Sequence, residues 1–292
     1  MIITIQNENI LAEINTYAAT LERLQNKKTG KEHIWAYDKE YWPRRTSICF
    51  PIVSVLKDDE TYIQGKLYHM ENHGFIRETE FDVAERADDC VVLCTKANDF
   101  TKEHYPYDFA FTATYRVEGS SLRITYDVKN LGEDQMYYCI GAHTTYNVPI
   151  DESDDMLKDL YLRFEEPETA PIHVVDGGLI AKEMQPGLEN QQELPIGGIF
   201  ENGAWMFDTE SLKSRKVTLA SRNNSYATTL DFTGFTNIIF WTKPGRMPFL
   251  CMEPMVGLAD DVDTDKTFEK KRNIQCLASG ETRTHVQVIT VE

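Results

Sequence analysis

Apolar and polar residues alternate with a period of two along much of the sequence. The run "FAFTATYRV" at residues 109–117 puts its apolar side chains on one face of an extended chain, and "LRITYDV" at residues 122–128 repeats the pattern. The turn "EGSS" between them has the length of a hairpin connection. This pattern is typical of half-buried β-strands, and it recurs at residues 90–97, 159–165, 216–221, 226–232, 237–243 and 285–291.

Helical periodicity is weak by comparison. The best candidates for helices are short, at about residues 182–192 and 264–271. The sequence therefore predicts an all-β sandwich or a larger assembly of two sheets, mostly antiparallel, with a few short helices. We treat residues 1–292 as a single domain. The least periodic region, residues 151–200, is where a hidden domain boundary would lie.

Composition restricts the partners of the protein. The sequence has 30 Lys and Arg residues against 47 Asp and Glu, a net charge of -17, which repels phosphate backbones and anionic lipids. We expect neither nucleic acid nor a membrane as partner. No segment approaches ~18 uninterrupted apolar residues, and "MIITIQNENILAEI" lacks the regions of a signal peptide. The six cysteines include no C-x-x-C pair. We expect a cytoplasmic protein with free thiols.

Several cofactor motifs are absent or incomplete. His69 and His73 in "HMENH" have the spacing of a zinc-binding helix, but the alternation before them and Gly74 after them predict a strand and a turn. The acidic run beginning at Asp261 resembles a calcium loop, with Lys266 where the loop needs glycine. The sequence contains no G-x-G-x-x-G, P-loop or G-x-S-x-G motif. We expect no metal and no organic cofactor.

Two segments place a titratable side chain in an unusual setting. In "GAHTTYNVPI", His143 lies between small residues and a polar run that ends at Pro149. In "MPFLCMEPMVGLAD", Glu253 follows an apolar run and precedes Pro254. A carboxylate within an apolar run is costly to bury unless it is paired or used, so Glu253 is a candidate partner for His143.

Other polar and aromatic residues occur where strands are expected to end. The segment "ENHGFIRE" contributes His73 and Arg77, and "YWPRRTSICF" contributes Arg44. Aromatic residues lie close by in the sequence, among them Trp241. A sugar stacks its C–H faces on aromatic rings and needs fixed donors and acceptors for its hydroxyls, so this mixture favours a sugar site.

Four segments follow one another along the chain: "WPRRTSICFPIV", "NHGFIRE", "IGAHTTYNV" and "FLCMEPMVGLADD". In this order they resemble the aldose 1-epimerases, or galactose mutarotase-like proteins, and within them the shorter bacterial LacX-type branch. The resemblance covers nearly the whole chain. It implies a β-supersandwich fold with a sugar site on one face. It also implies that His143 and Glu253 are the catalytic imidazole and carboxylate.

The resemblance further implies that Arg44, His73 and Arg77 bind substrate, and Trp241 is a candidate for the same role. Asp208, in "AWMFDTE", is the candidate for an aspartate that galactose mutarotases use in the middle of the chain. Two positions depart from the family pattern. The residue after the imidazole is commonly Pro in the family and is Thr144 here. The residue after Glu-Pro is commonly Trp in the family and is Met255 here.

The reaction implied is the interconversion of the α and β anomers of a hexose. Glu253 would take the proton of the anomeric hydroxyl and His143 would protonate the ring oxygen, so that the ring opens, rotates and closes again. We expect the protein to act as a monomer or a homodimer.

Three alternatives remain open. The protein is a hexose-6-phosphate mutarotase if Arg44, Arg45, Arg77 and Lys243 bind a phosphate. It is a non-catalytic sugar-binding or regulatory protein if the changes at Thr144 and Met255 removed turnover. A glycoside hydrolase is less favoured, because it needs two carboxylates across the scissile bond and only Glu253 lies in a suitable segment.

Overall fold

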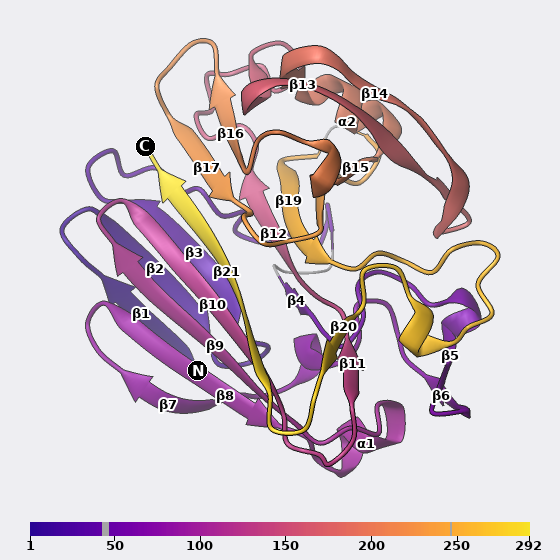
Figure 1. Ribbon diagram of the computed structural model, residues 1–292. Helices are drawn as coiled ribbons and strands as arrows, with labels where there is room; N and C mark the ends of the chain where they lie inside the picture. Colours follow the sequence, from indigo (N-terminus) through magenta and orange to yellow (C-terminus); the bar gives the residue numbers. More distant parts are fainter. Residues whose placement is uncertain (43–46, 246) are drawn as a thin grey trace.

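The computed structural model describes residues 1–42, 47–245 and 247–292, and in it the alternating segments form antiparallel strands (Figure 1). The largest sheet has nine strands in the order β14-β13-β16-β17-β21-β10-β9-β8-β7. Its strands are β7 (Asp82–Arg86), β8 (Cys90–Lys96), β9 (Phe109–Glu118), β10 (Ser121–Asn130), β13 (Leu160–Asp176), β14 (Leu179–Pro195), β16 (Lys216–Ser221), β17 (Ala227–Asp231) and β21 (Thr282–Val291).

A second sheet of five strands has the order β15-β18-β19-β12-β4. Its strands are β4 (Ser47–Cys49), β12 (Ile140–Asn147), β15 (Ala204–Asp208), β18 (Asn237–Trp241) and β19 (Phe249–Val256). The two large antiparallel sheets confirm the predicted all-β supersandwich.

Shorter strands and helices complete the described part of the chain. They are β1 (Ile2–Gln6), β2 (Ile10–Asn15) and β3 (Thr20–Asn26) in one sheet, the pair β5 (Glu60–Ile63) and β6 (Lys66–His69), the pair β11 (Met136–Tyr138) and β20 (Gln275–Leu277), the helices α1 (Asp99–His104) and α2 (Ile196–Asn202), and the 3-10 turns η1 (Lys57–Asp59), η2 (Ile76–Glu78), η3 (Thr209–Ser211) and η4 (Phe268–Lys270). No helix in this part of the chain has the length and hydrophobicity to span a bilayer.

The five-stranded sheet is buried on both faces, and its alternation decides which side chains reach the core. In β12, Ile140, Ala142 and Tyr146 join the main hydrophobic core. The residues of the other parity, Gly141, His143 and Thr145, point to the opposite face. Strand β19 behaves in the same way, because Leu250 and Met252 lie in the core. The face turned away from the core is therefore where polar groups of this sheet can meet a ligand.

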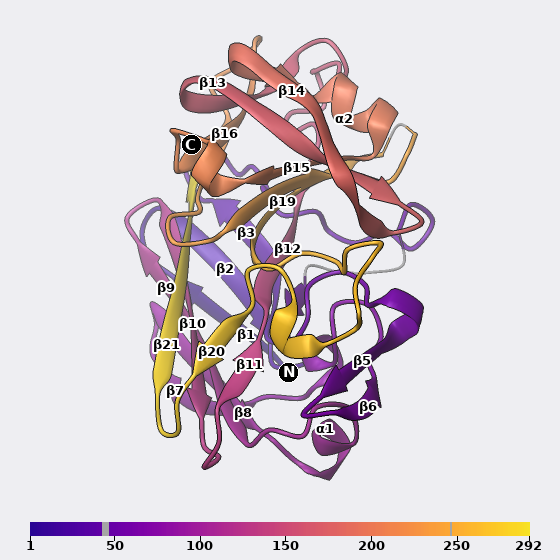
Figure 2. The same ribbon diagram turned by 45° about the vertical axis from the view of Figure 1, so that its right-hand side comes forward.

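Strands β13 and β14 form a hairpin of two 17-residue strands that leaves the rest of the nine-stranded sheet and reaches toward the C-terminal loops (Figures 1 and 2). We call it the arm. Its tip turns at Gly177 and Gly178, both with positive φ, which non-glycine residues rarely adopt. Beyond the turn, the Ile180 amide donates to the Asp260 carbonyl at 2.9 Å, and Lys182 pairs with Asp263 at 2.8 Å. These contacts fix the tip of the arm.

The helix predicted at residues 182–192 is wrong, because these residues lie within β14. The short helix predicted at residues 264–271 is confirmed only in part, as the 3-10 helix η4. Strand β14 is an edge strand with most of its side chains exposed, so burial imposes no period of two on its sequence. Pairing with β13 decides its conformation instead.

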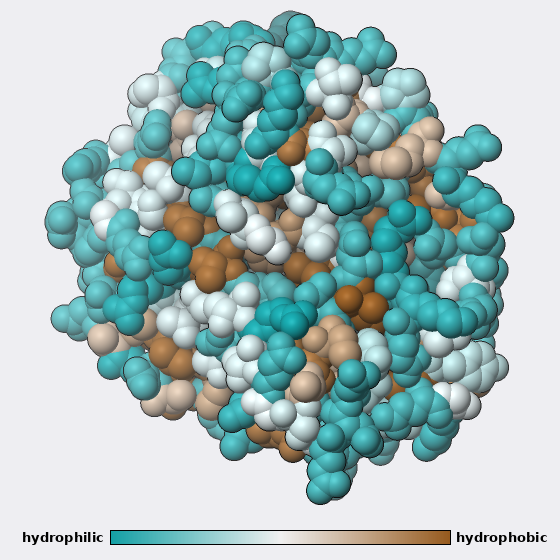
Figure 3. All heavy atoms as spheres, in the orientation of Figure 1, coloured by the Kyte–Doolittle hydropathy of each residue, from teal (hydrophilic) through white to brown (hydrophobic). Residues whose placement is uncertain are grey.

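The visible surface is mostly hydrophilic. On the face shown in Figure 3, hydrophilic residues cover most of the area and hydrophobic residues form small separate patches.

Candidate active site

The register of two central strands brings His143 and Glu253 together. Strands β12 and β19 are antiparallel, and Gly141 pairs with Met255 in their ladder, so residue 143 lies opposite residue 253. Pro254 has no backbone N–H and cannot donate to the ladder beside Glu253. Both titratable side chains point to the face of the five-stranded sheet that is turned away from the core.

The two side chains are close and almost completely buried. Nε2 of His143 lies 3.1 Å from Oε1 of Glu253, and the side chains are 8% and 4% exposed. The approach does not have the geometry of a hydrogen bond, and Nδ1 of His143 has no hydrogen-bond partner among the described residues. Buried polar groups without partners are rare and are expected where a ligand completes the site.

Burial also sets the charge of this pair. It lowers the pKa of His143 to about 4, with a smaller contribution from nearby Arg77, because an imidazolium is poorly solvated there. It raises the pKa of Glu253 well above its usual range for the same reason. Burial therefore favours the state in which both side chains are uncharged, with one titratable proton for the two groups.

Three aromatic rings surround the imidazole of His143. The Trp42 ring stacks on it with centroids 5.2 Å apart and an interplanar angle of 22°. Trp241 and His73 meet it edge to face, with centroids at 5.5 and 5.2 Å. These rings restrict the orientation of the imidazole and give the site the flat apolar faces that a sugar ring stacks against.

A cavity of about 800 Å³ opens over the pair. Its wall includes residues that precede and begin β3, among them Tyr17 and Thr20. It also includes the tip of the arm, with Val175 and Ile180. A volume of this size lies in the range of ligand-binding pockets, and its walls combine apolar side chains with a few polar groups.

The structure brings several of the predicted residues to this cavity. His143, Glu253, His73, Arg77 and Trp241 all line it. Arg44 and Arg45 lie outside the described residues. Asp208 is absent from the lining, although it lies on β15, whose residues Ala204 and Met206 belong to the wall.

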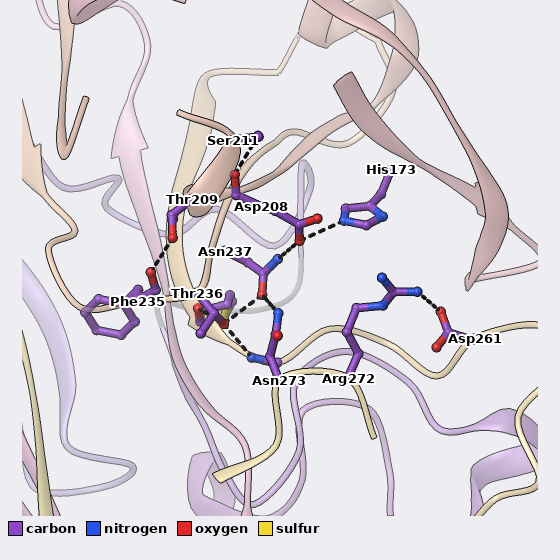
Figure 4. A network of polar contacts seen from close by, with 12 residues as sticks. His173, Asp208, Thr209, Ser211, Phe235, Thr236, Asn237, Asp261, Arg272 and Asn273 are labelled. Carbon is purple, nitrogen blue, oxygen red and sulfur yellow. Dashed lines mark hydrogen bonds and ion pairs between the residues drawn. The ribbon is translucent and has the colours of Figure 1, made fainter. Parts of the chain in front are cut away.

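Asp208 instead belongs to a polar network beside the cavity (Figure 4). Its Oδ1 accepts a hydrogen bond from the Asn237 side chain at 2.7 Å and lies 3.0 Å from Nε2 of His173. Asn273 donates in turn to Asn237 at 3.0 Å. Burial acts to raise the pKa of Asp208, but the contacts with His173 and Asn237 outweigh it and hold that pKa below its ordinary value.

Asp260, the first aspartate of the motif "FLCMEPMVGLADD", supports the cavity wall from behind. Its carboxylate pairs with the buried ammonium of Lys271 and accepts the Lys57 amide at 2.9 Å. Its carbonyl accepts the Ile180 amide at the tip of the arm, and its own amide donates to Val55. Ile180 and Val55 both line the cavity, so Asp260 connects two separate parts of the wall. The sequence showed the motif but not this role.

One group of atoms has the types and spacing that a metal ion could use. Donor atoms of His143, Cys251 and Glu253 lie within 4.8 Å of one another. Two of the three are His143 and Glu253, the titratable pair described above, so protons and a cation would compete for the same atoms. His69 and His73 share no helix, because β6 ends at His69 and His73 follows it in a loop.

Comparison with known proteins places the chain in a family. Residues 1–290 match the family model described as aldose 1-epimerase, and the chain belongs to that family. Among its relatives is the plasmid-encoded protein LacX of Lactococcus lactis subsp. lactis, 32% identical over 287 residues that cover 94% of each chain. The chromosomal LacX of the same organism matches equally well.

Solved structures show the same fold. A galactose mutarotase related enzyme from Lactobacillus acidophilus has a TM-score of 0.93 at 24% identity, covering 100% of this chain and 97% of its own. A galactose mutarotase-like protein from Lactobacillus casei ATCC 334 has a TM-score of 0.92 at 25% identity, covering 100% of both chains. The predicted family resemblance is therefore confirmed.

Proposed function

We propose that the protein is an aldose 1-epimerase that interconverts the α and β anomers of a hexose in the cavity over His143 and Glu253. The observation that carries this proposal is the buried His143–Glu253 pair, with 3.1 Å between Nε2 and Oε1, at the floor of a ligand-sized cavity. Anomer exchange needs one acid and one base beside the same sugar ring, and a pair that holds one proton supplies both.

In the proposed reaction Glu253 acts as the base and His143 as the acid. Hydroxyl groups of a bound sugar that donate to the Glu253 carboxylate favour its charged form and move the shared proton to His143. The carboxylate then takes the proton of the anomeric hydroxyl while the imidazolium gives its proton to the ring oxygen. The bond between the anomeric carbon and the ring oxygen breaks, and a carbonyl forms. Rotation of the aldehyde and reversal of these steps give the other anomer.

The remaining groups of the wall would hold the substrate. Arg77 and His73 line the cavity and carry donors for sugar oxygens, and Trp241 offers a flat ring beside His143. We propose a hexose without phosphate as the first substrate to test. Among the described Arg and Lys residues only Arg77 lines the cavity, and the Lys243 ammonium lies 3.2 Å from the Tyr41 carbonyl at the surface.

The test is NMR exchange spectroscopy between the anomers of D-glucose and D-galactose, with spontaneous exchange subtracted. Glu253→Gln and His143→Asn are each expected to lower the enzymatic rate by about 10²–10⁴, the usual contribution of a general acid or base. His33→Asn is the matched control, since His33 is also a buried imidazole but contacts Thr228 outside the cavity. It should keep the rate of the unchanged protein.

The same spectra with hexose 6-phosphates distinguish the alternative substrate. Faster exchange of the phosphates than of the free sugars would favour a hexose-6-phosphate mutarotase. No exchange above the spontaneous rate with any of these sugars would refute the proposed activity and favour a sugar-binding protein.

A further inference from the structure

His73 reaches the cavity through an unusual piece of backbone. His73 and the following Gly74 both have positive φ, 65° and 72°. A Cβ at Gly74 would lie 2.3 Å from the carbonyl oxygen of Phe50, so the two segments pack backbone against backbone. The Phe50 amide donates to the His73 carbonyl at 3.1 Å, and the His73 amide donates to the Ser54 carbonyl at 2.9 Å. This close packing fixes the position from which the imidazole extends.

The imidazole is fixed as well, through its Nδ1 atom. The backbone amide of Ser54 donates to Nδ1 of His73 at 3.0 Å. Sγ of Cys49 lies 3.1 Å from the same atom. A backbone amide can only donate, so Nδ1 must carry a lone pair, and the proton of the neutral ring is on Nε2.

The thiol of Cys49 is compatible with this arrangement. Cys49 is completely buried, and burial raises its pKa well above the usual value, with nearby Glu253 acting in the same direction. The side chain therefore remains a thiol whose S–H can donate to Nδ1. A thiolate would instead have attracted a proton to Nδ1 and competed with the Ser54 amide.

From these contacts we propose that Cys49 and the Ser54 amide are positioning groups that hold His73 as its neutral Nε2–H tautomer, a permanent hydrogen-bond donor to an oxygen of the bound sugar. This inference rests on the proposed function and deepens it by separating two roles. The His143–Glu253 pair moves protons, whereas His73 keeps its proton and only donates a hydrogen bond.

The first test reads the tautomer directly and needs no turnover. Long-range ¹H–¹⁵N spectra of the full chain labelled with ¹⁵N-histidine report which ring nitrogen is protonated, and His73→Gln identifies the signals by their loss. We expect the Nε2–H pattern for His73 at pH 7. An Nδ1–H or imidazolium pattern would overturn the inference even if the protein is an active epimerase.

The second test uses variants that imitate one ring nitrogen. The amide of Gln reaches the place of Nε2, and that of Asn the place of Nδ1. We expect His73→Gln to retain at least about tenfold more of kcat/KM than His73→Asn, since a tenfold rate corresponds to about 1.4 kcal/mol, a typical hydrogen bond. Equal losses in both variants would contradict a role for the Nε2–H donor.

Cys49→Ala tests the thiol, with Cys90→Ala as the matched control. Cys90 is also buried but lies on β8, away from the cavity. We expect Cys49→Ala to lower kcat about threefold to tenfold and to add a minor Nδ1–H population to the His73 signals, while Cys90→Ala changes neither. An unchanged tautomer pattern and kcat in Cys49→Ala would remove Cys49 from the proposal. If no variant or sugar shows turnover, the tautomer spectra still decide the inference separately from the proposed function.

Discussion

The side chains of His143 and Glu253 approach to 3.1 Å from adjacent antiparallel strands, in a site where burial opposes the charge of both. A pair of this kind has a preferred protonation state, with one proton for two groups. Its state can be measured through activity, stability and the response to pH.

The pH dependence of anomer exchange should be broad and flat around neutrality. The rate is expected to fall on the acid side near pH 4, where protonation of His143 adds a second proton to the pair. It is expected to fall on the alkaline side where Glu253 loses its proton. The measurement is kcat/KM by exchange spectroscopy from pH 3.5 to 9, with circular dichroism to exclude unfolding. A decline centred near 6.5, the value of a free imidazole, would contradict a desolvated pair.

Glu253→Gln should make the protein more stable while removing activity. The folded-state pKa of Glu253 is raised, so between its unfolded value and that pKa the folded state binds more protons, and stability falls as pH rises. The amide of Gln has no charge to bury, so the variant avoids a cost of about 1.4 kcal/mol for each unit by which folding raises the pKa of Glu253. We expect urea unfolding to show a gain of about 1–3 kcal/mol at pH 8 and a smaller gain at pH 5.

Glu168→Gln is the matched control for this prediction. Glu168 is equally buried, but its carboxylate accepts backbone hydrogen bonds from Lys213 and Ser214, so its charged form is satisfied. The same substitution should therefore destabilise the protein there, by about 1–3 kcal/mol. Loss of stability in both variants would mean that the Glu253 carboxylate is also satisfied.

The buried ion pair between Asp260 and Lys271 should be costly to break from either side. Asp260→Asn or Lys271→Met leaves a buried charge without its partner, which typically costs about 3–5 kcal/mol. The double variant removes both charges and should lose less than the sum of the two single losses. Urea unfolding measures all three, and single losses below about 1 kcal/mol would show that water replaces the missing partner.

Asp208→Asn separates a structural role from substrate binding. Asp208 accepts from Asn237 within a network beside the cavity, so we expect a loss of about 1 kcal/mol of stability and a KM within threefold of the unchanged protein. Arg77→Gln provides the comparison, because Arg77 lines the cavity and its loss should raise KM about tenfold or more. An equal rise in KM for both variants would assign Asp208 to the sugar site.

Much of the fold could be predicted because burial of one face imposes a period of two on a strand. That rule succeeded for β9, β10 and β21, which lie inside the nine-stranded sheet. It failed for β14, an edge strand whose exposed side chains carry no such period. Its conformation depends on pairing with β13, which a local pattern does not reveal.

The residues of the candidate site could be predicted where a single side chain stands in an unusual sequence setting or in a family motif. A carboxylate within an apolar run identified Glu253, and the family order of motifs identified His143. The contact between them depends on the register of strands 110 positions apart in the sequence, which only the structure gives. The contacts of Cys49 and Ser54 with His73 were missed because one uses a buried thiol and the other a backbone amide, and neither has a sequence signature.

The arm gives the cavity a wall that is separate in sequence from the strands that carry His143 and Glu253. Val175 and Ile180 at its tip face the cavity, while His143 and Glu253 belong to β12 and β19. Changes in the length or side chains of the tip can therefore accumulate without disturbing the contact between His143 and Glu253. Within such a scaffold, the shape of the cavity wall can diverge among related proteins while the contact between the two strands is kept.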